Sequence, residues 1–332
     1  MATAGNDVPP LIRDATTAQI AAILGAMRAV AETGSPASDA DRHAIAGAGR
    51  YMFGCTDTPA FDAIAPVTPA ALAAALTGSS LSEDAAKFLT IMAFVDGKLD
   101  KAKIASVLRY AGALGIHERY LDEVAAAAGD RLQEALADMT RSNMESITGR
   151  PWAGGDVNKW LMPYGDGNAD PALAARFASL QNLPPDSFGH AFWQHFTENS
   201  YTFPGDPKAL NAAFSLPHDS AHVLSGYDTT PRGELLASTF TAAMHPRYPM
   251  AGHVLPVIFS WHLQVQINTV AKKASRALDP EEFWHAWAGG AATTVDTFAP
   301  GWDFWDYTGV PLRELRTRWA IPADGLDSAG RS

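Results

Sequence analysis

At several points along this chain, a residue that favours the helix N-cap stands directly before a proline. The cap side chain accepts a hydrogen bond from the first turn, and proline suits the first helical position because the N–H group there needs no helical partner. No stretch shows the sustained apolar and polar alternation of a half-buried strand. The sequence therefore predicts an all-α protein, with helices starting at Thr68-Pro69, Asp170-Pro171, Asp206-Pro207, Thr230-Pro231 and Asp279-Pro280.

The composition changes near the middle of the chain. All nine tryptophans lie at or after Trp152, and residues 149–155 (GRPWAGG) have the composition of a linker. The part before this linker is rich in alanine and shows short helical patterns. We expect two helical domains, 14–150 and 151–322, with flexible tails at 1–13 and 323–332.

Charge and cysteine content exclude several classes of function. The 332 residues are 47% hydrophobic and carry a net charge of −11. These values fit a globular core and argue against a nucleic-acid partner or a purely electrostatic membrane contact. Cys55 is the only cysteine, so intramolecular disulfides and thiolate metal clusters are excluded. The N-terminal segment lacks the basic start and apolar core of a signal peptide, and we expect a cytoplasmic protein or one peripheral to the membrane.

Imidazoles and carboxylates gather most densely in residues 218–234, HDSAHVLSGYDTTPRGE. On a helix, Asp219 lies about 100° and His222 about 40° around the axis from His218. The three side chains therefore share one arc of the helix surface and can converge on one point.

The residues after this helix supply a fourth candidate ligand. Gly226 is a typical C-cap residue, and Thr230-Pro231 marks a new helix start. Glu234 then falls in the first turn, one position too late for a capping box, and is free to turn back toward the histidines. A bare pair of histidines four apart is more often a surface or core feature. With two carboxylates added, the set forms a mixed nitrogen and oxygen site suited to Zn²⁺, Mn²⁺ or Fe²⁺, so the candidate ligands are His218, Asp219, His222 and Glu234.

Residues 248–271 contain no Asp, Glu, Lys or Arg, although other polar residues interrupt the run. A membrane span needs about 20 predominantly apolar residues, so we expect a central buried helix or the wall of an apolar cavity. Within it, His253 and His262 are candidates for supporting the metal ligands, or else core histidines. In the helix expected over 187–198, we interpret the histidines as core or surface residues, because no carboxylate stands at ligand spacing from His190 or His195.

The N-terminal part resembles the TerB-like helical family linked with tellurite resistance. The resemblance is carried by FVDGKLDKAKIASVLRYAGALGIHERYLDEV (94–124), and it extends over about residues 40–145. Where that family usually has an acidic residue seven positions after the Asp, this chain has Lys103. A positive charge beside Asp96 and Asp100 argues against a metal site there. We interpret this part as an interaction or packing module.

The C-terminal part resembles a coenzyme Q (ubiquinone) biosynthesis family, that of the fourth yeast member of the Q-synthesis complex. Its signature H-D-x2-H-x11-E is matched by the four candidate ligands, with the intervening count intact. Two further segments look similar: LPPDSFGHAFWQHF (183–196) and GVPLRELRTRWAI (309–321). The resemblance covers about residues 180–322, and the fused N-terminal helical domain is a departure from the family.

Membership of this family would imply an all-helical domain with a divalent metal, usually zinc, at His218, Asp219, His222 and Glu234. It would also imply an apolar groove for a prenyl tail. The associated activity is removal of the ring carboxyl, coupled to hydroxylation at that carbon, on a polyprenylated 4-hydroxybenzoate-type precursor. Members also organise a membrane-associated biosynthetic complex.

Three functions fit these observations. The leading hypothesis is a metal-dependent enzyme of a lyase or oxidative decarboxylase type. Its substrate would be a prenylated or otherwise lipophilic ring that resembles a quinone precursor, and the metal would hold an acidic oxygen of that ring. The second is a non-catalytic lipid-binding scaffold with a structural metal, which closed tetrahedral coordination would favour. The third is a metal-dependent hydrolase, although no glutamate follows the first histidine as in H-E-x-x-H. Expected partners are a lipophilic small molecule and either a second copy or biosynthetic-complex proteins, with no nucleic acid.

Overall fold

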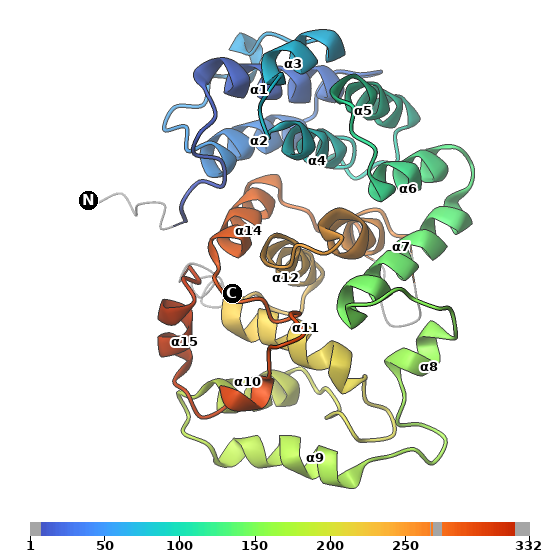
Figure 1. The fold of residues 1–332 in the computed structure, drawn as a ribbon, viewed down its shortest axis with the longest axis vertical. Coiled ribbons are helices and arrows are strands. Elements are labelled where there is room, and N and C mark those ends of the chain that lie inside the picture. The colour runs from blue at the N-terminus through green and yellow to red at the C-terminus, as the bar shows by residue number, and fades with distance from the viewer. Residues whose placement is uncertain (1–7, 266, 268–273, 323–332) are drawn as a thin grey trace.

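The computed structural model describes residues 8–265, 267 and 274–322, and this part of the chain is almost entirely helical (Figure 1). Two isolated bridges are the only β-type pairings among these residues, and they form no sheet. The all-α prediction is therefore confirmed. The elements up to residue 148 are α1 (Thr17–Ala31), α2 (Asp39–Gly47), η1 (Ala48–Met52), η2 (Phe61–Ala63), α3 (Pro69–Leu76), α4 (Ser82–Met92), α5 (Lys101–Leu114), α6 (Arg119–Ala128) and α7 (Leu132–Thr148).

The remaining elements carry the candidate ligands and the charge-free run. They are α8 (Val157–Leu161), α9 (Pro171–Ala178), η3 (Ser179–Asn182), α10 (Phe188–Glu198), α11 (Ala212–Ser225), α12 (Pro231–Met244), η4 (Pro249–Val254), α13 (Leu255–Val257), η5 (Ile258–His262), α14 (Pro280–Ala292), η6 (Phe304–Asp306) and α15 (Leu312–Arg318).

Four of the five predicted helix starts are confirmed by their caps. Thr68, Asp170, Thr230 and Asp279 each accept a backbone hydrogen bond in the first turn of a helix that begins with proline. The prediction at Asp206-Pro207 is wrong, because the chain makes a turn there and α11 begins only after residue 211. N-cap residues and proline are also favoured in turns, so this pair alone does not distinguish the two structures.

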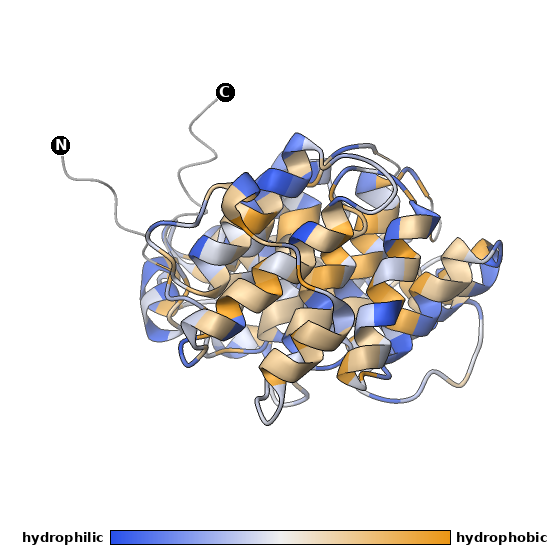
Figure 2. Ribbon diagram, turned by 90° about the horizontal axis from the view of Figure 1, so that it is seen from above, coloured by the Kyte–Doolittle hydropathy of each residue, from blue (hydrophilic) through white to orange (hydrophobic). Residues whose placement is uncertain are grey.

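Two hydrophobic cores hold the helices together. The larger core takes residues from the N-terminal helices and also from α12, α14 and the segment 249–262, whereas the smaller takes residues between 147 and 321. Figure 1 shows α12 and α14 between the α1–α6 end and the α9–α10 end, and Figure 2 shows hydrophobic residues concentrated on the central helices. The larger core thus crosses residue 150, and the division into two domains at that point stays a prediction.

Two local contacts explain how the central helices pack so closely. Trp284 on α14 is fully buried and donates its indole N–H to the Ala44 carbonyl of α2 at 2.8 Å. On the other face of α14, a Cβ at Gly290 would lie 2.1 Å from the Phe240 carbonyl oxygen of α12. Only glycine permits this approach of the two backbones.

A buried ion group joins α2 to α5 in the N-terminal part. The Lys103 Nζ atom lies 2.9 Å from Asp41 Oδ1 and 3.1 Å from Asp96 Oδ2, and all three side chains are buried. The ammonium group lies where two carboxylates meet, so its positive charge partly compensates both in a region that is largely closed to solvent. Removing the lysine would leave the buried Asp41 carboxylate without a counter-charge and Asp96 with only the exposed Lys98 at 3.9 Å.

The charge-free run forms an irregular, buried helical segment over residues 249–262. Two π-helical stretches flank the short α13, which contains Pro256 and therefore lacks one backbone donor. Most of its side chains are buried in the larger core. Residues 266 and 268–271 of the predicted helix lie outside the described residues. In the described part of the chain, no helix has the length and hydropathy required to cross a membrane.

Candidate metal centre

Helix α11 ends in a way that fixes the position of its last turn. Gly226 adopts the left-handed conformation with φ 80° and donates its N–H to the His222 carbonyl. From α15, Arg316 donates to the carbonyl oxygens of Val223 and Leu224, each at 2.8 Å. A cation at the C-terminal end of a helix satisfies free carbonyls and interacts favourably with the helix dipole. The turn that carries His222 is thus held from outside the helix.

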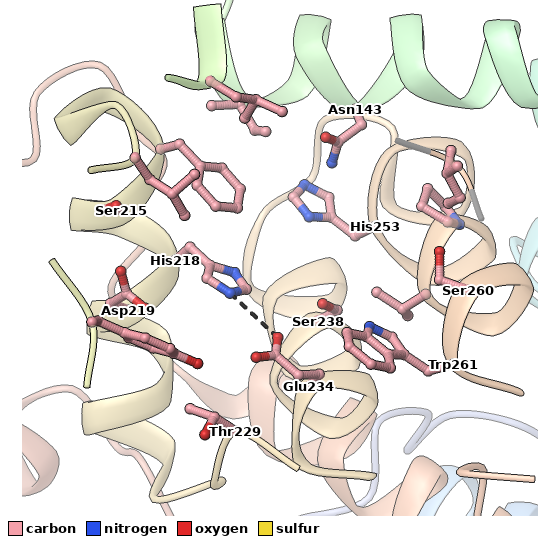
Figure 3. Close-up of a pocket in the computed structure, with 18 of the residues that line it drawn as sticks. Asn143, Ser215, His218, Asp219, Thr229, Glu234, Ser238, His253, Ser260 and Trp261 are labelled. Carbon is pink, nitrogen blue, oxygen red and sulfur yellow. Dashed lines mark ion pairs between the residues drawn. The ribbon is translucent and has the colours of Figure 1, made fainter. Parts of the chain in front are cut away.

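Helix α12 begins with a tight turn that aims its first residues at α11. The Thr230 hydroxyl accepts the Gly233 N–H and donates to Asp228 Oδ1. A Cβ at Gly233 would lie 2.0 Å from Asp228 Oδ1, so the turn requires glycine. Glu234 follows in the first turn of α12, and its side chain extends toward α11 (Figure 3).

The structure brings three of the four candidate ligands together. Glu234 Oε2 lies 3.5 Å from His218 Nε2 and 3.5 Å from His222 Nε2. One ligand atom from each residue lies within 4.8 Å of the others, so the group could hold a metal ion. Ligand atoms about 2.1 Å from a tetrahedral metal would be about 3.4 Å apart, close to the two observed distances. The two distances to Glu234 therefore fit a single ion, and the two imidazoles lie close enough to share it.

The hydrogen bonding of His222 leaves one ring nitrogen available to a metal. Its Nδ1 atom lies 3.0 Å from the Tyr227 carbonyl oxygen, which can only accept, so Nδ1 carries the proton. Its Nε2 atom is buried and has no hydrogen-bond partner within the described residues. Metal-binding histidines commonly donate their second ring nitrogen to a backbone carbonyl in this way.

The electrostatics of the group favour one negative and one positive charge when no metal is bound. Burial lowers the pKa of His222, but the Glu234 carboxylate outweighs burial and raises this pKa to about 9. Burial raises the pKa of Glu234, but His222 and then His218 outweigh it and hold this pKa far below its ordinary value. A divalent cation would replace the His222 proton as the partner of the carboxylate.

Asp219, the fourth candidate ligand, points to a different partner. Its Oδ1 atom lies 3.2 Å from His195 Nε2 on α10, and it does not belong to the three-residue group. The His195 ring also stacks on His222, with centroids 5.5 Å apart. His195 thus contacts Asp219 and also the candidate ligand His222. The spacing of His195 in the sequence did not indicate either contact. His195 and Asp219 are 24 positions apart in sequence, so no local pattern indicates their contact, which depends on how α10 packs on α11.

The two other candidate histidines occupy separate places. His253 lines a cavity next to the three-residue group, and its Nε2 atom lies 2.7 Å from Ser146 Oγ on α7. His262 lies in the larger core, where Nε2 is 3.1 Å from the Phe94 carbonyl oxygen and Nδ1 accepts the Leu278 N–H. His262 therefore joins the charge-free segment to the turn after α4, and it is not among the residues that line the cavity.

The cavity beside the three-residue group has a volume of about 570 Å³. Its walls come from α7, α11, α12 and the segment 249–262, together with residues 200–210. His218, Asp219 and Glu234 line the cavity, and Trp261 of the charge-free segment lies across from His218 and Asp219 (Figure 3). Val257 of the same segment also lines the cavity. Lys208 is the only lysine or arginine among the described lining residues. The charge-free segment is thus both a buried helical element and a cavity wall, the two structures expected for it.

A comparison with models of known protein families found no match for this chain. A comparison with curated proteins also found no match. The resemblances to the coenzyme Q biosynthesis and TerB-like families therefore stay predictions from the sequence.

Proposed function

We propose that the protein is a metal-dependent enzyme that acts on a lipophilic aromatic ring bearing a carboxylate or phenolate oxygen. One observation carries the proposal: a two-histidine, one-carboxylate group, whose ligand atoms lie within 4.8 Å of one another, has His218 and Glu234 in the wall of a cavity with a mainly apolar lining. Neither feature alone would suggest catalysis. Together they place an electrophilic ion beside a space suited to an apolar ligand.

His218, His222 and Glu234 would hold the ion, with zinc favoured and manganese or iron as alternatives. Three protein ligands leave a coordination position for substrate or water, as in catalytic zinc sites, whereas structural sites are closed by four. Because Asp219 is bonded to His195, this open position supports an enzyme over the scaffold hypothesis. When bound, the metal would supply a Lewis acid that polarises an oxygen of the substrate.

The cavity supports the choice of ligand. Its volume lies within the range of about 300–1,000 Å³ that small-molecule sites occupy. Apolar and aromatic side chains such as Phe196, Phe214, Trp261 and Phe298 line it, and they can contact a ring and an alkyl or prenyl chain. Lys208 adds one positive charge for an anionic group. Peripheral contact with a membrane, where such ligands dissolve, belongs to the same proposal.

The resemblance to the coenzyme Q biosynthesis family supports a specific reaction class. It suggests removal of a ring carboxyl coupled to hydroxylation at the same carbon, with a prenylated hydroxybenzoate as substrate. His195, Asp219 and Lys208 are charged or titratable groups that lie close to the three ligands or in the cavity wall. We propose that they orient the substrate's polar end.

Metal analysis of the purified protein and of two variants tests this function. We expect about one metal ion per chain in the wild type and in His190→Ala, and less than a tenth of that in His222→Ala. His190 is a suitable control because it lies outside the three-residue group. Equal metal content in all three proteins would refute the site.

Chemistry is tested separately by incubating metal-loaded protein with a 3-alkyl-4-hydroxybenzoate in the presence of oxygen. We expect carbon dioxide release that the metal-free protein does not show. Tight binding without release would support the lipid-binding scaffold instead.

A further inference from the structure

The end of the cavity formed by α7 and η4 carries polar atoms that the metal group does not use. His253 and Asn143 both line this end, and Figure 3 shows the His253 ring between Asn143 and His218. His253 is 6% exposed and packs against the rings of His245 and Phe298. The two side chains are therefore held in place before any ligand arrives.

The hydrogen bonds of Ser146 determine which His253 nitrogen carries a proton. Ser146 Oγ lies 2.7 Å from the Arg247 carbonyl oxygen, which can only accept, so the single hydroxyl hydrogen goes there. The same Oγ lies 2.7 Å from His253 Nε2, and it must accept from that nitrogen. His253 is thus protonated on Nε2.

The second nitrogen of His253 is left as an acceptor. Burial, and then the nearby imidazoles of His245 and His218, lower the pKa of His253 to about 3, so the ring is neutral at physiological pH. A neutral ring protonated on Nε2 has a lone pair on Nδ1. Within the described residues, this Nδ1 atom has no hydrogen-bond partner.

Asn143 adds a second acceptor beside it. Its Nδ2 atom donates to the Gly252 carbonyl oxygen at 2.6 Å, which fixes the orientation of the side-chain amide. The other end of the amide, Oδ1, can only accept. The cavity end therefore offers two fixed acceptors on neighbouring elements, α7 and η4.

We propose that His253 Nδ1 and Asn143 Oδ1 form a specificity site that selects ligands carrying a hydroxyl group, whose O–H hydrogen is donated to His253 Nδ1, with Asn143 Oδ1 beside it as the acceptor for a second donor. This inference deepens the proposed function and rests on it for the use of the same cavity. A ligand without a donor would leave both acceptors buried and unpaired, which is the situation that gives the strongest discrimination between similar ligands. The metal group and this acceptor pair would then bind two different polar groups of one ligand.

Two matched probes test the proposal: 4-hexylphenol, which can donate a hydrogen bond, and 4-hexylanisole, which cannot. Binding of each is measured by calorimetry with zinc-loaded and with zinc-stripped protein. We expect about tenfold tighter binding of the phenol in both forms, the value of one hydrogen bond. In His253→Phe the preference should fall below about twofold, whereas His253→Asn, which keeps an acceptor near the Nδ1 position, should retain most of it.

The outcomes separate this inference from the proposed function. Equal binding of the two probes by the wild type, or an unchanged preference in His253→Phe, would overturn the acceptor site. A preference that disappears when zinc is stripped would place the phenol at the metal and overturn the acceptor site while supporting the metal centre. A preference that is identical with and without zinc, in a protein that binds no zinc at residues 218–234, would support the acceptor site and contradict the metal centre.

A measurement on the unmodified protein covers the case in which a variant does not fold. Nitrogen-15 spectra of the histidine side chains, assigned through the backbone, report the protonated nitrogen of each ring. We expect His253 to be protonated on Nε2 between pH 6 and 8, with the Nδ1 resonance shifting when 4-hexylphenol is added and not when 4-hexylanisole is added. Protonation on Nδ1, or equal shifts with both probes, would overturn the proposal.

Discussion

Zinc binding should become much tighter as pH rises from 7 to 8.5, because His222 must lose a proton before it can bind the metal. The Glu234 carboxylate outweighs burial and raises the pKa of His222 to about 9 in the metal-free protein. A metal-binding imidazole must be neutral, so the proton competes with the ion throughout this range. Zinc affinity therefore falls as pH falls, and the proton stops competing with zinc for His222 only above about pH 9.

The size of the effect follows from the pKa. With a pKa of about 9, the neutral fraction of His222 rises about 25-fold between pH 7 and 8.5, whereas an ordinary pKa of about 6.5 gives only about a 1.3-fold rise. The zinc dissociation constant should decrease by the same factor. In the metal-free protein the raised pKa also adds stability, at most about 3 kcal/mol, which is fully present below pH 6.5 and lost as pH rises through 9.

Competition with a chelator of known pH dependence measures the zinc dissociation constant at pH 7.0, 7.5, 8.0 and 8.5. A nuclear magnetic resonance titration of His222 in the metal-free protein gives its pKa independently. An affinity that levels off above pH 7, together with a pKa near 6.5, would refute the reasoning about the charge pair.

Three further predictions concern packing, and urea unfolding of the purified variants measures each free energy. Arg316→Ala should lower the free energy of unfolding by about 2–3 kcal/mol and weaken zinc binding, because two carbonyls of α11 lose a charged donor. Arg318→Ala on the same helix should lower it by less than about 1 kcal/mol. Lys103→Met should cost about 3–5 kcal/mol, because it removes the only buried counter-charge of Asp41 and the buried partner of Asp96 among the described residues. The exposed Lys98→Met should cost less than about 1 kcal/mol. Gly290→Ala should cost at least about 2 kcal/mol, because its methyl group would meet a backbone oxygen of α12. Equal losses within either matched pair, or a neutral Gly290→Ala, would contradict these packing arguments.

Helix starts were readable in the sequence because capping is local chemistry. Thr68 and Asp279 each accept a hydrogen bond from a backbone N–H two or three residues later, so the signal and its effect lie in one turn. The same signal gave a wrong helix start at Asp206, because a short polar side chain before proline is also favoured at the beginning of a turn. Packing of the neighbouring elements in three dimensions decides between a helix and a turn there, and the sequence around Asp206 does not contain that information.

The candidate site was readable only where its residues share one helix or adjoin it. His218 and His222 lie one turn apart, and Glu234 is delivered by a helix start that the sequence marks clearly. Helical geometry placed Asp219 within reach of the same point, but it could not show that His195 would bind this carboxylate from another helix.

Contacts between distant elements also set the role of the remaining groups. Asn143 and His253 are 110 residues apart in sequence and meet only because α7 packs against η4. Composition was similarly incomplete as a guide to domains. Tryptophans begin only at residue 152, yet Trp284 is buried against Ala44 in a core that both parts of the chain build.

A crystal structure of the zinc-loaded protein, with anomalous diffraction recorded at the zinc edge, tests the central claim most directly. We predict one anomalous peak per chain, bound by His218 Nε2, His222 Nε2 and the Glu234 carboxylate, with its remaining position open to the cavity. Asp219 should stay bonded to His195. No peak at this group, or a peak closed by Asp219 as a fourth protein ligand, would contradict the account.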